Sequence, residues 1–114
     1  LKIDADIQLE DITWELFESV EQLRPFGTGN TKPLFVSRGV NVAAFSAVGK
    51  DSSHLKLRVQ SAGGKIVNAI GFRFGEWIGK LTLGCNIDLV YEVDMNEWNG
   101  NRELQMKIVD IGSN

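Results

Sequence analysis

The chain has 114 residues, of which 43% are hydrophobic and 24% charged; this composition is typical of one folded domain and excludes wholesale disorder. No apolar run approaches the ~20 residues of a membrane span, and the single cysteine, Cys85, can form no internal disulfide, so we expect a cytoplasmic protein without membrane contact. The net charge of −3, taken alone, argues against nucleic acid as a partner.

The charge is distributed unevenly along the sequence. Residues 1–31 hold seven acids and two bases, residues 32–83 hold eight bases and two acids, and residues 84–114 hold six acids and two bases. A cationic middle between two acidic ends indicates an anionic partner. Evenly spread, solvated lysines would produce the same pattern, so both interpretations stay open.

The first quarter of the sequence predicts a short strand and then a helix. Apolar residues alternate over residues 1–9, which is the period of a strand. Asp11 is a candidate N-cap, and apolar residues then recur at helical spacing over residues 12–23. We expect this amphipathic helix to end before Pro25, because a proline disfavours helical geometry in the residue before it.

Residues 24–35 predict a sharp, well-defined turn between the helix and the strands. Both prolines of the chain, Pro25 and Pro33, fix the backbone near its ends. Gly27, Gly29 and Asn30 between them enter positive φ most easily. The Gly-Thr-Gly-Asn run is not a phosphate-binding loop, because a proline and a strand follow it where such a loop needs a helix.

The rest of the chain predicts a mainly β fold. We expect five strands at residues 34–48, 54–60, 65–74, 86–95 and 102–111, with a bulge at Gly39 and a short helix or ordered loop within 75–84. Five such strands with a helix between the third and fourth are the plan of an OB-fold, a five-stranded Greek-key barrel. Small β-sandwiches share this spacing. The Asn99-Gly100 pair predicts a tight hairpin between the last two strands.

The residue types exclude a catalytic or metal centre in this chain. One histidine and one cysteine, with no carboxylates clustered near either, leave no nucleophile–base pair and no metal-ligand set. We therefore predict no catalytic residue, no metal site and no cofactor within these residues.

A binding face is the better-supported prediction. In OB-folds, single strands bind across the second and third strands and the adjoining loops, where cations contact the backbone and aromatic rings stack on bases. We expect the cations of the first three strands to cluster there, beside small outward residues, Ala69 and Gly71, that leave room for a ligand. The predicted DNA contacts are Arg38, His54, Lys56, Arg58, Lys65, Arg73 and Trp98. His54 on a polar strand face also fits an ordinary surface histidine, and Trp98 fits equally a residue folded back over the barrel end.

Four segments, in order within residues 3–111, fit one family pattern. The first, residues 24–35, contains Pro-Phe-Gly-x-Gly-Asn-x-x-Pro-x-Phe, and the second, residues 48–57, contains Val-Gly-x-Asp-x-x-His-Leu-Lys. Ala-Ile-Gly-Phe at 69–72 and Asn-Glu-Trp-Asn-Gly at 96–100 complete the set. Together they resemble the OB domain of the bacterial single-strand-specific exonuclease family RecJ.

This resemblance implies a function for the parent protein. RecJ enzymes degrade single-stranded DNA from the 5′ end in DNA repair and recombination, with Mg²⁺ or Mn²⁺ held by Asp-His-His motifs in a separate catalytic core. Those motifs are missing here, and the chain begins with Leu1 and not Met, so we expect an inactive fragment of such an enzyme.

The resemblance also implies a division of the chain and its partners. Residues 1–24 would form the junction to a preceding domain, and residues 25–114 the OB-fold domain. The partners would be single-stranded DNA and the catalytic domains of the same polypeptide. The alternative is a docking module whose groove contacts those domains or another protein.

Overall fold

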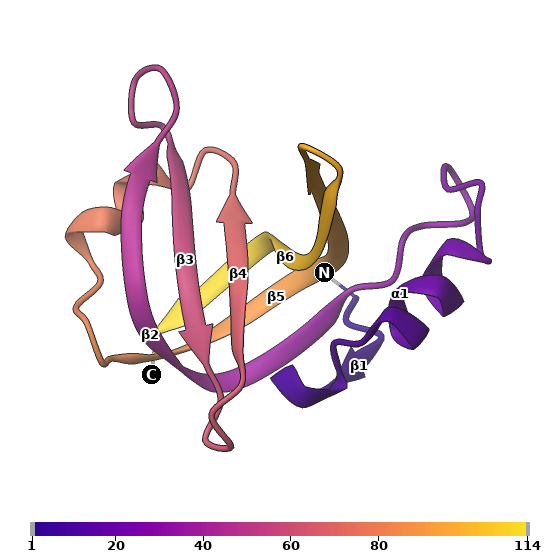
Figure 1. Cartoon of the computed structure of the whole chain (residues 1–114), viewed down its shortest axis with the longest axis horizontal. Coiled ribbons are helices and arrows are strands. Elements are labelled where there is room, and N and C mark those ends of the chain that lie inside the picture. The colour runs from indigo at the N-terminus through magenta and orange to yellow at the C-terminus, as the bar shows by residue number, and fades with distance from the viewer. Residues whose placement is uncertain (1, 114) are drawn as a thin grey trace.

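The computed structural model describes residues 2–113. Five strands curl into a barrel, with a short strand and a helix at its side (Figure 1). In chain order the elements are β1 (Ala5–Asp6), the 3₁₀ helix η1 (Leu9–Asp11), α1 (Trp14–Glu21), β2 (Phe35–Val48), β3 (His54–Gln60), β4 (Ile66–Gly71), the 3₁₀ helix η2 (Gly75–Gly79), β5 (Asn86–Trp98) and β6 (Asn101–Ser113). Within residues 2–113, no helix has the length and apolar character needed to cross a membrane.

The barrel has the strand order β2–β3–β4–β6–β5, and β5 pairs again with β2 to close it. These pairings are antiparallel except that of β4 with β6, which run parallel from the Asn68–Gln105 pair to the Ile70–Lys107 pair. With a short helix between the third and fourth barrel strands, this is the OB fold that the sequence predicts. The predicted hairpin is also confirmed, because Asn99 and Gly100 both have positive φ, at 47° and 78°.

The long strand β2 pairs with two other strands, and the bulge predicted at Gly39 makes this possible. Its first half pairs with β5 and its second half with β3. The register against β5 shifts between Ser37 and Val40, on either side of Gly39, which has a φ of 63°. A bulge at a glycine lets a strand bend sharply, so one strand can close the barrel.

The core follows the alternation of the strands. Leu55, Leu57 and Val59 of β3 are fully buried, as are the inward residues of β5 from Ile87 to Val93. Burying each such side chain contributes roughly 1.5–3 kcal/mol. The segment before the barrel, which comprises β1, η1 and α1, is called the lead-in here. Its residues Leu9, Ile12 and Val20 pack in the same cluster, so the lead-in shares the core of the barrel. The division into residues 1–24 and 25–114 remains a prediction.

The prediction for the faces of β4 is wrong. Ala69 is 1% exposed and points into the barrel, while Ile66 and Ile70 lie on the outer face. Ala69 pairs with Leu57 and with Met106, two larger side chains that are themselves fully buried. Because they fill the interior at this level, only a small residue fits between them.

The strand β4 also ends earlier than predicted, at Gly71. The next turn closes with a hydrogen bond from the Phe74 N–H to the Gly71 carbonyl, and Arg73 within it has a φ of 67°. A left-handed residue cannot continue a strand, so Arg73 belongs to a loop and to neither face of β4.

The helix is shorter than the sequence pattern suggests. Its N-cap is Thr13, whose Oγ1 accepts a hydrogen bond from the Leu16 N–H at 3.2 Å. The predicted cap, Asp11, instead accepts from the Gln8 N–H and closes η1. The helix ends at Glu21, which leaves Leu23 half exposed, outside the apolar stripe.

A buried polar chain attaches the lead-in to the barrel. The Ser37 hydroxyl donates to the Ile7 carbonyl at 2.8 Å and lies 2.7 Å from the Tyr91 hydroxyl. Because Ser37 has a single proton, Tyr91 donates to it. Burial raises the pKa of Tyr91 to about 12, since charging a phenol away from water is unfavourable.

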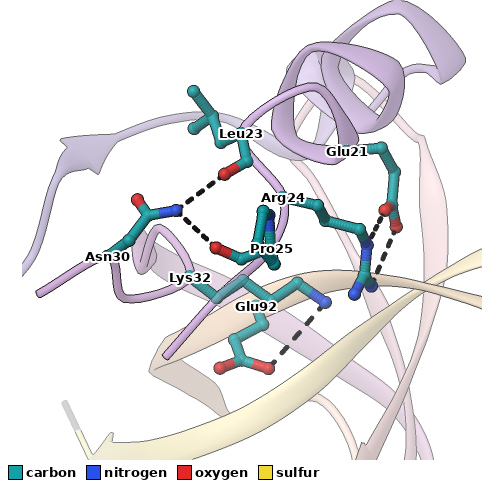
Figure 2. Close-up of polar contacts among 7 residues, drawn as sticks. All are labelled: Glu21, Leu23, Arg24, Pro25, Asn30, Lys32 and Glu92. Atoms are coloured by element: carbon teal, nitrogen blue, oxygen red, sulfur yellow. Dashed lines mark hydrogen bonds and ion pairs between the residues drawn. The ribbon is translucent and has the colours of Figure 1, made fainter. Parts of the chain in front are cut away.

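The turn after α1 is held by its own side chains (Figure 2). The Asn30 amide donates to the carbonyls of Leu23 and Pro25, both at 2.7 Å. Arg24 pairs with Glu21, which holds the pKa of that carboxyl below its usual value. The two Asn30 bonds satisfy backbone carbonyls that lie outside regular secondary structure. This confirms the sharp turn predicted at residues 24–35.

Candidate nucleic-acid interface

The outer face of the barrel presents two rows of side chains that cross three strands. In the first row, Lys56 of β3 pairs with Ile70 of β4, and Ile70 pairs with Lys107 of β6. The second row holds Arg58, Asn68 and Gln105 in the same way. Paired residues on neighbouring strands point to the same side of a sheet. We call this surface the groove face; it also includes Phe72, Trp98 and Glu103.

A groove of about 640 Å³ runs over this face. Lys56, Ile70 and Phe72 line one part of it, and Trp98, near the tip of the β5–β6 hairpin, lines another. Phe72 is 52% exposed and Trp98 44% exposed. Large rings that stay exposed beside cations are the combination that stacks on bases and holds a backbone. The structure thus favours an exposed Trp98 over one folded back onto the barrel.

The two central cations have no acidic partner within the described part of the chain. Among residues 2–113, neither Lys56 nor Arg58 forms an ion pair, and both side chains are exposed. The Lys107 ammonium lies 5.9 Å from the centre of the Phe72 ring. An anion can therefore bind Lys56 and Arg58 without breaking an ion pair within residues 2–113, and these cations lose only part of their hydration.

Acidic residues limit the groove face on the side of β5 and β6. Glu103 accepts a hydrogen bond from Asn68, and Asp94 accepts one from Gln105 at 3.1 Å. Each of these two carboxylates lies beside a neutral amide. The positive side of the face is therefore that of β3, with Lys107 as its extension across β4.

His54 has a structural task at the end of β3. Its Nδ1 accepts a hydrogen bond from the Arg73 N–H at 3.0 Å, so this nitrogen carries no proton. Its ring meets Phe72 edge-on, with centroids 5.3 Å apart. A side chain on Gly49, which has a φ of 94°, would collide with the same ring. His54 thereby fixes the loop that presents Phe72 and Arg73.

Arg38 does not join the other cations, and the predicted cluster is wrong in this respect. Its Nε lies 2.9 Å from Asp6, and its guanidinium lies 3.9 Å from Asp88. The bulge at Gly39 and the pairing of this part of β2 with β1 and β5 place Arg38 among acids. It therefore helps to hold β1 onto the barrel.

Lys65 and Arg73 lie near opposite ends of β4. The Lys65 Nζ donates to the Ile12 carbonyl at 2.7 Å, which ties the lead-in to the barrel. Arg73 is exposed in the loop after β4. Of the seven predicted contacts, the structure brings Lys56, Arg58 and Trp98 to the groove face, with His54 and Arg73 at one end of it and Lys65 at the other.

Two groove residues are missing from the sequence-based set, Lys107 and Phe72. Lys107 lies in the acidic last block of the sequence, and only the parallel pairing of β4 with β6 brings it into the same row as Lys56, on the other side of Ile70. Phe72 follows Ile70 at strand period, but the sequence does not show which face of β4 is outside. The exposed aromatic becomes recognisable only once Ala69 is placed in the core.

The described residues contain no cluster of three or more His, Cys, Asp or Glu side chains that could hold a metal ion. The groove is lined mainly by amide, aliphatic and aromatic side chains, with Lys56 and Glu103 as its charged residues.

Comparisons with known proteins agree with this interpretation of the fold. The family described as the RecJ OB domain matches residues 3–110. The single-stranded-DNA-specific exonuclease RecJ of Bacillus subtilis is 28% identical over 109 residues, which are 96% of this chain and 14% of that protein. The chain therefore spans about a seventh of the length of this relative.

Two solved structures share the fold. RecJ from Thermus thermophilus, crystallised with Mn²⁺, superposes with a TM-score of 0.76 at 21% identity, over 100% of this chain and 16% of that chain. The second single-stranded-DNA-binding protein of Mycobacterium smegmatis superposes with a TM-score of 0.58 at 16% identity, over 71% of this chain and 84% of that one.

Proposed function

This chain belongs to the RecJ OB domain family, and from that membership and the geometry of the groove face we propose that it binds single-stranded DNA. Lys56 and Arg58 contact backbone phosphates, and Trp98 stacks on a base. Lys107 and Phe72 join them from β6 and from the loop after β4. Arg73 and Lys65 contact the backbone near the two ends of β4, and His54 positions the loop.

The observation that carries the proposal is that two cations without an ion pair among residues 2–113 lie beside two exposed rings. Lys56 and Arg58 lie on one strand, and the groove runs from Lys56 to Phe72 and Trp98. The proximity of these cations to the rings supports binding of a ligand that has both a charged backbone and flat bases. The M. smegmatis protein of the same fold bears the name of a single-stranded-DNA-binding protein, which supports the same ligand.

We further propose the setting of this domain. The relatives that share its family are named single-stranded-DNA-specific exonucleases, so the whole protein is proposed to degrade single strands in the 5′→3′ direction during DNA repair and recombination. Its Mg²⁺ or Mn²⁺ would lie in a catalytic core outside this chain, and this chain alone would be inactive. The single cysteine is in keeping with the reducing cytoplasm.

The test is the binding of a fluorescent oligothymidylate to the 114-residue chain, followed by anisotropy at several salt concentrations. With about four phosphates engaged, the slope of log K against log salt is expected near −3. Trp98→Ala should weaken binding by ~1–3 kcal/mol. A slope of zero, or unchanged affinity of the folded Trp98→Ala protein, would argue against this face.

A docking role is the second candidate, favoured by exposed apolar residues away from the groove. Leu83 is 69% exposed and Leu23 is 50% exposed. Because this chain matches only 14–18% of the length of the relatives, such residues are candidate contacts to the rest of the polypeptide. Lys56→Glu should weaken DNA binding and spare docking, while Leu83→Ser should weaken docking and spare DNA binding.

A further inference from the structure

A second hollow, of about 620 Å³, lies at the opposite end of β4 from Phe72. The parallel pairing of β4 with β6 begins only at Asn68 and Gln105. Before that point the strands diverge, so Ile66 and Arg102 lie apart across an opening. Trp14, the first residue of α1, forms another wall. We call this hollow the lead-in pocket.

The lead-in pocket combines an indole with three cations. Trp14 is 38% exposed, and the Arg102 guanidinium lies 5.1 Å from the centre of its ring. Phe17 supports the indole edge-on at 5.8 Å. Arg58 and Lys65 line the remaining wall, and the bond from Lys65 to the Ile12 carbonyl holds its ammonium there while leaving two of its N–H groups for other acceptors.

Among the described residues that line this pocket, the carboxylate is that of Glu103, and it already accepts a hydrogen bond from Asn68. Three cations against one hydrogen-bonded acid leave a positive site. An exposed indole beside guanidinium and ammonium groups suits a ligand with a flat ring and a negative charge. A nucleotide unit has both.

The lead-in pocket adjoins the groove of Phe72 and Trp98, and the hydrogen-bonded pair Asn68 and Glu103 lies between them. Asn68 and Glu103 line both. From Ile66 to Phe72 an extended strand rises about 20 Å, so the two hollows together form one track along β4. OB folds engage ~4–16 nucleotides of single strand, so a track that runs past the groove face is within the range of such sites.

We infer that the lead-in pocket is a second nucleotide subsite, in which a base stacks on Trp14 while Arg58, Lys65 and Arg102 contact the flanking phosphates. This inference rests on the proposed function and extends it. It makes the lead-in helix part of the DNA track and adds Trp14 and Arg102 to its contacts. The guanidinium of Arg102 then exchanges part of its contact with the ring for a phosphate.

The experiment uses the three tryptophans of the chain as separate reporters. The protein is produced with fluorotryptophan, its three fluorine resonances are assigned by single Trp→Phe replacements, and an oligothymidylate of about twelve nucleotides, within the length that OB folds engage, is added to saturation. Trp98 reports the groove and Trp14 the lead-in pocket. Trp77, which packs against the core beside Lys80, is the internal control.

The inference predicts that the resonances of both Trp98 and Trp14 shift and that Trp77 stays in place. If the Trp98 resonance shifts and the Trp14 resonance does not, the lead-in pocket is not a nucleotide subsite, while the proposed function still holds. An oligonucleotide that does not bind at all would overturn both.

A matched pair of variants adds an affinity readout. Arg102→Ala and Lys80→Ala each remove a cation that lies over a tryptophan ring. Arg102→Ala should weaken oligothymidylate binding about fivefold at about 0.1 M salt, the value for one lost phosphate contact, and Lys80→Ala should not change it. Equal affinities for the two variants would contradict the inference.

Discussion

Two regions of this small protein use their polar residues in opposite ways. In the turn and the first residues of β2, residues 24–38, side chains such as Asn30, Ser37 and Arg38 contact other parts of the same chain. On the groove face, Lys56 and Arg58 contact no acid among the described residues, and two rings stay exposed. The comparison separates residues that build the fold from residues that are available to a ligand.

The comparison also shows why the most distinctive stretch of the sequence is not the binding site. Within residues 24–35, Gly29 has a φ of 84° and Asn30 bonds two backbone carbonyls, so these residues serve the turn itself. Lys56 and Arg58 are unremarkable in sequence, since any exposed strand face carries such residues. Their meaning comes from the exposed rings that other segments place beside them.

The largest expected effect concerns the buried chain that attaches the lead-in. Tyr91 has a pKa of about 12 in the folded protein against about 10 when unfolded. The neutral phenol therefore stabilises the fold fully below a pH of about 10, and this contribution is lost as the pH rises to about 12. The free energy of unfolding should fall by roughly 2–3 kcal/mol over that range.

Urea unfolding at a series of pH values measures this loss. Tyr91 is the single tyrosine of the chain, so tyrosinate absorbance reports its pKa directly. Tyr91→Phe is the control, because its alkaline loss should be smaller by the stated amount. Titration of the folded protein's phenol near its ordinary pKa of about 10 would show that the hydroxyl is not buried as described.

The next effect compares cations of the two regions. Replacing both Lys56 and Arg58 by alanine should weaken single-strand binding about 25-fold at about 0.1 M salt, since each phosphate contact is worth about fivefold there. Arg38→Ala removes the same charge from the acidic side of the barrel and should change affinity less than about twofold. Fluorescence anisotropy measures the affinity of each variant for the single strand. Equal losses of affinity for Arg38→Ala and Arg58→Ala would contradict the proposed difference between the two regions.

A smaller effect is expected in the turn. Asn30→Ala removes two hydrogen bonds to backbone carbonyls and should lower the free energy of unfolding by about 1–2 kcal/mol. Affinity for single strands should stay unchanged at temperatures where the variant is folded. Thr28→Ala, an exposed position in the same turn, is the matched control in urea unfolding. Weakened binding by a folded Asn30→Ala protein would make the turn part of the interface.

The smallest effect is that of Arg24→Ala. Its ion pair with Glu21 lies at the surface, where such pairs contribute little. Glu21 has a lowered pKa, so the contribution is present at neutral pH and disappears as the pH falls through that pKa. Thermal unfolding of the variant and the wild type should therefore differ slightly at neutral pH and differ less in acid, where only the contact of Arg24 with the Phe26 ring remains. A large difference at neutral pH would contradict the small contribution expected of an exposed ion pair.

Much of the fold could be predicted because local patterns are unambiguous where one face is polar. Leu55, Leu57 and Val59 alternate with polar residues, so the pattern predicts β3 to the residue. In β4 the alternation is ambiguous, since Ile66 and Ile70 are as apolar as Val67. Packing between Leu57 and Met106 decides that Ala69 lies inside, and no local pattern contains that information.

The candidate site was less predictable, for a related reason. Lys56 and Arg58 share one strand, and their common face follows from the sequence. Arg38 could not be assigned, because its acidic partners Asp6 and Asp88 come from strands far along the chain. Lys107 and Trp14 reach the track along β4 only through the parallel pairing of β4 with β6 and the docking of the lead-in.

The most direct test of the distinction between the two regions is a map of backbone amide shifts in the ¹⁵N-labelled chain when oligothymidylate is added. The account predicts shifts concentrated in residues 54–60, 66–73 and 98–107 and around Trp14, with residues 25–35 unchanged. Shifts concentrated in residues 25–35, with β3 and β4 unaffected, would contradict it.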